Sequence, residues 1–192
     1  MIAQRKQGHT AQEYFLHDQQ SSDKLEYYAG YIVAQAGSTA RHNLITANFI
    51  GHLYAPVRTN GCQVFPSDMR VQAIDQRVYT YPDLTIVCGT PQYAEPGEMT
   101  LLNPTVIIEI LSPSTQAKDR KEKLEYYRTI ESLQAYILVA QDAPYVQYYT
   151  RQTPHFWYVN LVDDMAATIE IAAINATISM QAIYTGITFS RQ

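Results

Sequence analysis

The run Val106-Ile107-Ile108-Glu109-Ile110-Leu111 places a single glutamate among aliphatic residues, most of them β-branched. A short apolar run of this kind, followed by a Ser-Pro pair, predicts a strand that is buried on both of its faces. Desolvating an unpaired carboxylate in such a strand is unfavourable by several kcal/mol. Glu109 therefore needs a compensating partner, and a bound cation is one that proteins commonly use.

A second acid stands at the start of another apolar stretch. Asp83 follows Tyr81-Pro82 and precedes the strand-like run 84–88. Side chains alternate between the two faces of a strand, so neighbouring strands could direct Asp83 and Glu109 to one side of a sheet. Two such carboxylates repel each other unless a cation lies between them, and Mg²⁺ prefers oxygen ligands. The structural alternatives are a turn acid after proline for Asp83 and an acid paired with arginine or lysine for Glu109.

A lysine after the central strand completes the candidate site. Asp119, Lys123 and Tyr127 stand at i, i+4 and i+8 of a predicted helix and share one stripe of its surface. The stripe borders the apolar side of the helix, so we expect Lys123 near the sheet. Its amine could orient an attacking water or neutralise a pentavalent phosphorane. The alternative is a lysine at the helix edge whose tip reaches solvent.

Composition favours a folded protein without a generally basic surface. The chain has 192 residues, of which 46% are hydrophobic and 17% charged, and its net charge is −4. These values predict one domain over 1–192 and argue against disorder and against a basic nucleic-acid coat. Binding of a polyanion would need a local patch. Basic residues do gather after the central strand, although acids are interleaved with them: Lys118, Arg120, Lys121, Lys123 and Arg128.

The two cysteines, Cys62 and Cys88, lie in separate strand-like segments without a C-x-x-C motif. We interpret them as free thiols in the core of a protein from a reducing compartment, and a structural zinc site is not expected. The first residues lack an apolar signal region, and no apolar stretch approaches the length of a membrane span. The sequence therefore predicts a cytoplasmic protein without a membrane partner.

The chain-wide pattern predicts an α+β fold: a mixed twisted sheet flanked by two principal helices, with additional antiparallel strands. The strand 105–111, the helix after it and the strand 133–140 should form a βαβ crossover. Predicted helices are 10–19 with a Thr10 capping box, 39–59 capped by Ser38, 119–129 with a cap-like Asp119/Glu122 start, and a last turn at 180–184. In the helix 39–59, the expected apolar face is Leu44, Ala47, Ile50 or Gly51, and Tyr54. Predicted strands are 25–29, 31–36, 62–65, 69–74, 78–79, 83–88, 105–111, 133–140, 145–150, 155–161 and 168–173, with a loop at 89–103.

Three segments together resemble the Uma-type putative restriction endonuclease family, which is grouped with the PD-(D/E)XK nuclease superfamily. They are Pro82-Asp83, the run Glu109-Ile110-Leu111-Ser112-Pro113-Ser114-Thr115, and Asp119-Arg120-Lys121-Glu122-Lys123 with Tyr127. The resemblance extends from 25–33 through His42 to 133–142. It implies a restriction-endonuclease-like core.

The resemblance also implies roles for individual residues. Asp83 and Glu109 match the two catalytic acids that bind metal. The lysine expected two residues after the second acid is replaced by Leu111, and Lys123 would supply the catalytic amine from the following helix. Glu26, His42 and Tyr127 would be accessory residues near the site. Without the resemblance, Glu26 would be an acid on a strand face and His42 a histidine on a helix surface.

The leading hypothesis is an endonuclease that hydrolyses phosphodiester bonds in DNA, with Mg²⁺ as cofactor and Mn²⁺ as a possible substitute. A homodimer is expected by analogy, since a two-fold dimer could present one site to each DNA strand. One alternative is a catalytically inactive nucleic-acid-binding or dimeric interaction module of the same fold. Another is a hydrolase of small phosphoesters with the same metal chemistry. Ser112 and Ser114 are expected to shape the turn after the central strand.

Overall fold

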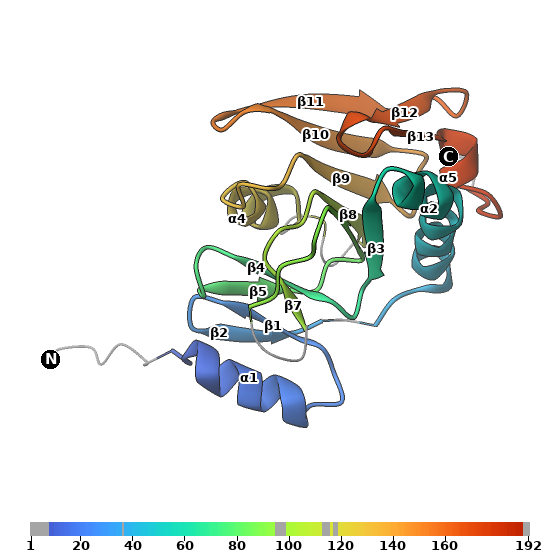
Figure 1. The fold of residues 1–192 in the computed structure, drawn as a ribbon. Helices are drawn as coiled ribbons and strands as arrows, with labels where there is room; N and C mark the ends of the chain where they lie inside the picture. The colour runs from blue at the N-terminus through green and yellow to red at the C-terminus, as the bar shows by residue number, and fades with distance from the viewer. Residues whose placement is uncertain (1–7, 36, 95–98, 113–115, 117–118, 190–192) are drawn as a thin grey trace, which may run out of the picture.

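The computed structural model describes residues 8–35, 37–94, 99–112, 116 and 119–189, and their α+β arrangement is drawn in Figure 1. The predicted fold class is confirmed. In chain order the elements are α1 (Ala11–Gln20), β1 (Leu25–Tyr28), β2 (Tyr31–Ala34), α2 (Ala40–Thr59), β3 (Cys62–Pro66), β4 (Arg70–Ala73), β5 (Val78–Thr80), β6 (Leu84–Cys88), β7 (Thr100–Leu101), β8 (Val106–Leu111), η1 (Asp119–Lys123), α4 (Leu124–Tyr127), β9 (Ala135–Ala140), β10 (Val146–Thr153), β11 (Phe156–Val162), β12 (Thr168–Ile171), η2 (Ala172–Ile174), β13 (Ala176–Ser179) and α5 (Met180–Ile183).

The central sheet has the strand order β11-β10-β9-β8-β6-β3. Within it β8 runs parallel to β9 and antiparallel to β6, so the sheet is mixed. The chain leaves β8, passes through η1 and α4, and returns as β9, which confirms the predicted crossover. A second sheet has the order β2-β1-β5-β4-β7, and β12 pairs with β13 in a third.

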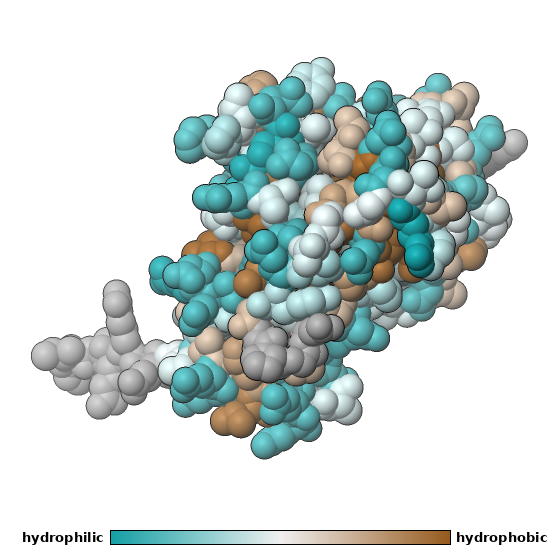
Figure 2. Space-filling view, in the orientation of Figure 1, coloured by the Kyte–Doolittle hydropathy of each residue, from teal (hydrophilic) through white to brown (hydrophobic). Residues whose placement is uncertain are grey.

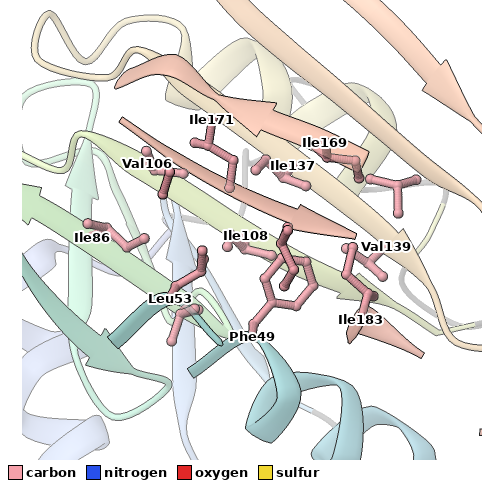
Figure 3. Packing of buried hydrophobic residues seen from close by; sticks show 14 of the residues in the cluster. Phe49, Leu53, Ile86, Val106, Ile108, Ile137, Val139, Ile169, Ile171 and Ile183 are labelled. Carbon is pink, nitrogen blue, oxygen red and sulfur yellow. The ribbon is translucent and has the colours of Figure 1, made fainter. Parts of the chain in front are cut away.

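The central sheet separates two hydrophobic clusters of different character. On one side, α2, α5, β12 and β13 cover aliphatic residues of the sheet, among them Val106, Ile108 and Ile110 of β8 (Figure 3). On the other side, α4 and the second sheet cover a cluster that contains several buried tyrosines. Figure 1 shows α2 and α4 on these opposite sides. Glu109 faces the tyrosine-rich side, because it alternates with Ile108 and Ile110 along β8.

The helix α2 has the predicted length but a different buried face. Its cap is Thr39 rather than Ser38, and the Thr39 hydroxyl accepts a hydrogen bond from the His42 N–H. The predicted apolar face is wrong, since Leu44 and Tyr54 are exposed. The buried stripe begins with a polar residue, His42, so its helical spacing of apolar residues is hard to recognise in the sequence. The buried residues are His42, Ile45, Phe49, Leu53 and Val57.

The segment after β8 also differs from the predicted helix. Residues Asp119–Lys123 form one π-helical turn before the short helix Leu124–Tyr127. Asp119 is buried inside this turn, where its carboxylate lies 3.4 Å from the Lys123 amine. The predicted helix start at Asp119 is a π-helical turn, with Asp119 inside it and its carboxylate against Lys123.

Other differences are smaller. The strand β7 lies within the predicted loop 89–103, and β13 is an additional strand before the last helical turn. The Thr10 capping box is present, and the remaining predicted strands agree to within two residues at most ends. Ser114, which is expected to shape the turn, and the basic residue Lys118 lie outside the described residues. Figure 2 shows hydrophilic side chains interspersed with intermediate and hydrophobic ones on the face in view.

The interpretation of two free thiols is wrong, because Cys62 and Cys88 form a disulfide. They are register partners on the neighbouring strands β3 and β6. Their separation of 26 positions gives no indication of this pairing in the sequence. In the described part of the chain, no helix is long and apolar enough to span a membrane.

Candidate active site

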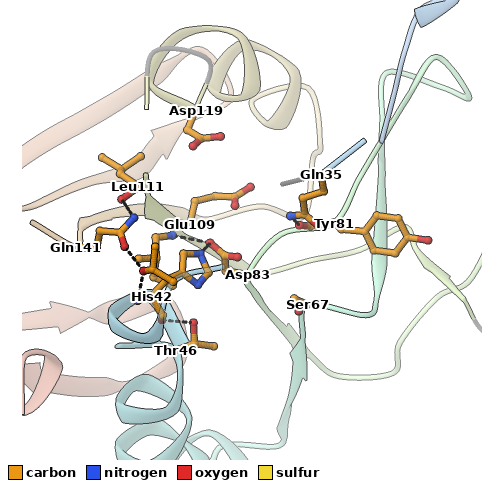
Figure 4. A network of polar contacts seen from close by, with 12 residues as sticks. Gln35, His42, Thr46, Ser67, Tyr81, Asp83, Glu109, Leu111, Asp119 and Gln141 are labelled. Atoms are coloured by element: carbon orange, nitrogen blue, oxygen red, sulfur yellow. Dashed lines mark hydrogen bonds and ion pairs between the residues drawn. The ribbon is translucent and has the colours of Figure 1, made fainter. Parts of the chain in front are cut away.

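The two strand acids meet because β6 and β8 are antiparallel neighbours. Leu84 of β6 pairs with Ile108 of β8, and extending this register by one residue sets Asp83 opposite Glu109. Opposed residues of antiparallel strands project to the same face of the sheet. Both acids are buried, and Figure 4 shows them in one network of polar contacts. The expected placement of the two carboxylates on one side of one sheet is thus observed.

Lys123 reaches this pair from the π-helical turn. Its Nζ atom lies 2.9 Å from a carboxylate oxygen of Glu109, and the side chain is almost completely buried. The alternative interpretation, a lysine at the helix edge whose tip reaches solvent, is therefore wrong. The π-helical turn directs both Asp119 and Lys123 inward.

Glu26 belongs to the same cluster. Its carboxylate lies 3.3 Å from the Lys123 amine and accepts hydrogen bonds from the Tyr28 hydroxyl at 2.7 Å and the Tyr81 N–H at 3.2 Å. Glu26 is thus a buried acid of the site. The contact with Tyr81 also fixes the chain two residues before Asp83.

His42 reaches the site from the first turn of α2. Its Nε2 atom lies 3.0 Å from the carboxylate of Asp83, which also accepts a 2.7 Å hydrogen bond from the Ile110 N–H. His42 is buried, so the helix-surface interpretation is wrong. Within the described residues, its Nδ1 atom is also buried and has no hydrogen-bond partner.

The start of α2 is held against β8 by an amide bridge. The Thr39 hydroxyl donates to the Gln141 side-chain oxygen, and the Gln141 amide donates to the Leu111 carbonyl at 3.1 Å (Figure 4). Because Leu111 ends β8, this bridge sets the position of His42 relative to Asp83.

Tyr127 supplies the second contact to the Glu109 carboxylate. Its hydroxyl donates to the Glu109 carboxylate at 2.9 Å and shares a 2.9 Å hydrogen bond with the Thr80 hydroxyl. Tyr127 is fully buried on the same side of the sheet. It therefore orients the Glu109 carboxylate from α4, the helix that follows the π-helical turn.

The buried charges of the cluster are unbalanced. In the described part of the chain, four buried residues contribute carboxylates to the cluster: Glu26, Asp83, Glu109 and Asp119. The Lys123 amine lies within 4.0 Å of the carboxylates of Glu26, Glu109 and Asp119, and Asp83 pairs with His42 instead. Burial raises the pKa of Glu109 well above its ordinary value; Lys123 opposes this shift, and the charges of Asp119, Asp83 and Glu26 add to it. Among the described residues, the buried carboxylates of the cluster thus outnumber its buried amine.

The same acids keep Lys123 charged. Burial alone would lower the pKa of the Lys123 amine, but the negative charges of Glu109 and Glu26, with contributions from Tyr127 and Tyr28, raise it well above its ordinary value. Lys123 is therefore an ammonium ion at neutral pH.

The donor set fits a hard divalent cation bound partly by the protein. Asp83 and Glu109 offer carboxylate oxygens from opposed positions, and the surplus negative charge favours a cation. Among the described residues, no three or more His, Cys, Asp or Glu side chains converge as a complete protein metal site. Mg²⁺ suits such an incomplete set, since it commonly takes one or two carboxylates and completes its shell with water and substrate phosphate oxygens.

Asp119 is the member of the cluster that sequence reasoning missed. Its position was interpreted as a helix cap, although its i, i+4 spacing to Lys123 was visible. That spacing allows an ion pair in any helix, and only the burial of both partners gives this pair its significance.

Comparison with known proteins identifies a similar fold and the family of this chain. The fold matches a solved structure: the crystal structure described as a putative nuclease belonging to DUF820 from Anabaena variabilis aligns with a TM-score of 0.74. The alignment covers 91% of this chain and 97% of that chain at 22% sequence identity, so it supports the fold alone.

The chain belongs to the Uma2 family, whose model carries the description "Putative restriction endonuclease" and matches residues 11–178. Two relatives from Synechocystis sp. are similar over most of their length. The uncharacterized protein sll1609 is 32% identical over 85% of this chain and 92% of its own, and the uncharacterized protein slr1290 is 28% identical over 93% and 92%. The family resemblance predicted from the motifs is confirmed.

Proposed function

We propose that this protein is a magnesium-dependent nuclease that hydrolyses phosphodiester bonds in DNA. The observation that carries the proposal is the cluster of buried carboxylates around the opposed pair Asp83 and Glu109, whose negative charge exceeds that of its one lysine. Burying several carboxylates close together destabilises a fold, so such a cluster points to function rather than to stability. Membership of the Uma2 family supports the same class of chemistry.

In this proposal, Asp83 and Glu109 hold Mg²⁺, for which Mn²⁺ can substitute. When bound, the ion lowers the pKa of a coordinated water and offsets charge that develops on the phosphodiester. His42 holds the Asp83 carboxylate at 3.0 Å, and Tyr127 holds the Glu109 carboxylate at 2.9 Å. Both ligands are thereby oriented before a substrate arrives.

Lys123 acts as a fixed positive charge. Its amine lies between Glu109 and Glu26, at 2.9 and 3.3 Å, and carries its proton at neutral pH. An ammonium in this position can orient the attacking water and stabilise negative charge on the phosphorane. The lysine therefore assists attack electrostatically and does not serve as the base.

DNA and a homodimer remain parts of the proposal. A two-fold dimer would present one site to each strand of a duplex. Because binding to duplex DNA releases condensed counterions, it should weaken steeply as salt increases. A protein that hydrolyses only small phosphoesters would lack this salt-dependent duplex binding.

The test is a plasmid-nicking assay with Mg²⁺ titrated from zero, comparing the purified wild type with Asp83→Asn and Glu109→Gln. We expect nicking to require the ion and each substitution to reduce it about 100-fold or more, as for removal of a group that acts in the transition state. Ser132→Ala, which removes a hydroxyl bonded to the Pro104 carbonyl at the other end of β8, is the matched control. Equal nicking by all variants would indicate contamination and overturn the proposal. Metal binding without nicking would favour the catalytically inactive module.

A further inference from the structure

A cavity of about 260 Å³ lies beside the carboxylate cluster on the same side of the central sheet. Leu111 lines the cavity and follows Glu109 by two residues, so their side chains share one face of β8 at a separation of about 7 Å along the strand. Ala140, the register partner of Leu111 on β9, forms another part of the wall. The cavity wall therefore begins two residues along β8 from Glu109, the proposed metal ligand.

Arg120 gives this cavity a positive charge. The residue follows Asp119 in the π-helical turn, and its guanidinium carbon lies 5.4 Å from the centre of the Tyr145 ring, which also lines the cavity. Its Nη1 atom donates to the Gln147 side-chain oxygen at 2.9 Å. Among the described side chains, no carboxylate comes within 4.0 Å of this guanidinium. The charge is therefore available to an anionic ligand.

Both members of the arginine–tyrosine pair are held in place. The Gln147 amide that orients Arg120 donates in turn to the Tyr149 hydroxyl at 2.6 Å. The backbone of Tyr145 is fixed by the buried Tyr184, whose hydroxyl accepts from the Tyr145 N–H at 3.1 Å and donates to the Tyr145 carbonyl at 2.9 Å. Groups oriented before binding lose less conformational entropy when a ligand arrives.

The chemistry of the pair matches one nucleotide. A guanidinium offers several N–H donors in a planar fork that suits phosphate oxygens. The Arg120 guanidinium lies over one face of the Tyr145 ring, and the opposite face of such a ring can stack on any unpaired base. The cavity volume of about 260 Å³ is smaller than that of pockets that hold drug-sized ligands, which start at about 300 Å³. The cavity therefore suits part of a nucleotide rather than a larger molecule.

We infer that this cavity is a subsite for the unpaired nucleotide next to the phosphodiester that is cut, with its phosphate on Arg120 and its base on Tyr145. The inference rests on the proposed nuclease function and adds to it a preference for single-stranded or locally opened DNA. A base inside a duplex is stacked on its neighbours and cannot stack on Tyr145 at the same time.

The test measures binding of a fluorescein-labelled oligothymidylate by anisotropy, with Ca²⁺ in place of Mg²⁺ to prevent cleavage. Arg120→Ala and Tyr145→Leu should each weaken binding about ten-fold, in the range that alanine substitution gives for a stacked base or a phosphate contact. Tyr145→Phe keeps the ring and should bind like the wild type. Arg120→Ala should also reduce the slope of log K against log salt by about one.

Two further variants separate the local effect from net charge. Arg128→Ala removes the same charge from an exposed pair with Glu125 on the same segment, and its binding should change less than two-fold. Asp142 is an exposed acid on the cavity wall, so Asp142→Asn should bind at least as tightly as the wild type. Circular dichroism checks that each variant is folded.

The outcomes for the subsite and for the proposed function differ. Suppose that the wild type nicks plasmid, but Arg120→Ala or Tyr145→Leu binds the oligonucleotide with the affinity of the wild type. The subsite is then overturned and the nuclease proposal stands. If the wild type neither binds the oligonucleotide nor nicks plasmid, the proposed function is overturned and the subsite with it. Loss of binding in both variants, with Tyr145→Phe and Arg128→Ala unaffected, supports the subsite.

Discussion

The two sides of the central sheet differ in what they bury. On the side of α2, the strand β8 contributes Val106, Ile108 and Ile110 to a cluster of aliphatic side chains. On the side of α4, the same strand contributes Glu109, which meets Lys123 and Tyr127. Residues adjacent in the sequence thus enter environments of opposite polarity.

This difference shows how one strand can serve stability and function together. Burial of aliphatic surface stabilises the fold by about 25 cal/mol per Å². Burial of like charges opposes folding, and only partners such as Lys123 and the surrounding hydroxyls make it tolerable. We therefore expect substitutions in the aliphatic cluster on the α2 side to change stability alone. Substitutions in the carboxylate cluster, and of His42, which contacts Asp83 from the start of α2, should change cation binding and activity.

The largest effect on stability is expected for Lys123→Met. Removing the ammonium leaves Glu26, Glu109 and Asp119 without their shared partner, which should lower the free energy of unfolding by about 3–5 kcal/mol in EDTA. Urea denaturation measures this change. An unfolding midpoint equal to that of the wild type would mean that the amine does not hold the cluster together.

The sharpest comparison pairs two neighbours on β8. Ile108→Ala should lower the free energy of unfolding by about 2–5 kcal/mol, because it leaves a cavity in the aliphatic cluster, and should leave Mn²⁺ affinity unchanged. Glu109→Gln should abolish Mn²⁺ binding while keeping or raising stability, because it removes a charge whose pKa is raised by burial. Calorimetry and urea denaturation on both variants check this. Similar profiles for the two variants would contradict the division between the faces.

A smaller effect is expected from the disulfide between β3 and β6. Replacing Cys62 and Cys88 by alanine should lower the free energy of unfolding by about 2–4 kcal/mol, because the cross-link restricts the unfolded chain. The Mn²⁺ affinity should not change, since both sulfurs lie on the α2 side of the sheet. A loss of Mn²⁺ affinity in the double variant would show that the two sides are coupled.

The smallest effect is expected for single hydroxyl groups. Tyr127→Phe and Tyr184→Phe should each destabilise the fold by about 1–2 kcal/mol, because each removes buried hydrogen bonds. Only Tyr127→Phe should weaken Mn²⁺ binding, since its hydroxyl orients Glu109. Equal Mn²⁺ affinities for the two variants would remove Tyr127 from the site.

Much of the fold could be predicted because its patterns are local. The apolar run at β8, the turn signals of the hairpins and the Thr10 capping box each act over a few residues. The buried face of α2 could not be read in the same way, since His42 begins the stripe and interrupts its apolar period. The disulfide depends on the pairing of β3 with β6, which no spacing of cysteines reveals.

The candidate site shows the same limit. Asp83 and Glu109 could be found because an acid next to an apolar strand is conspicuous, and Lys123 because of its place in the family motif. Asp119 could not be assigned, since its burial depends on a π-helical turn that the sequence does not indicate. Local pattern identified the acids, and only the tertiary arrangement revealed that they outnumber their positive partners.

Titration of Mn²⁺ into the apo protein, followed by isothermal calorimetry, tests the central claim most directly. We expect saturable binding to the wild type and to Ser132→Ala, and no binding to Asp83→Asn or Glu109→Gln. Undiminished heat in either acid variant, or no binding to the folded wild type, would contradict a cation held between these two strands.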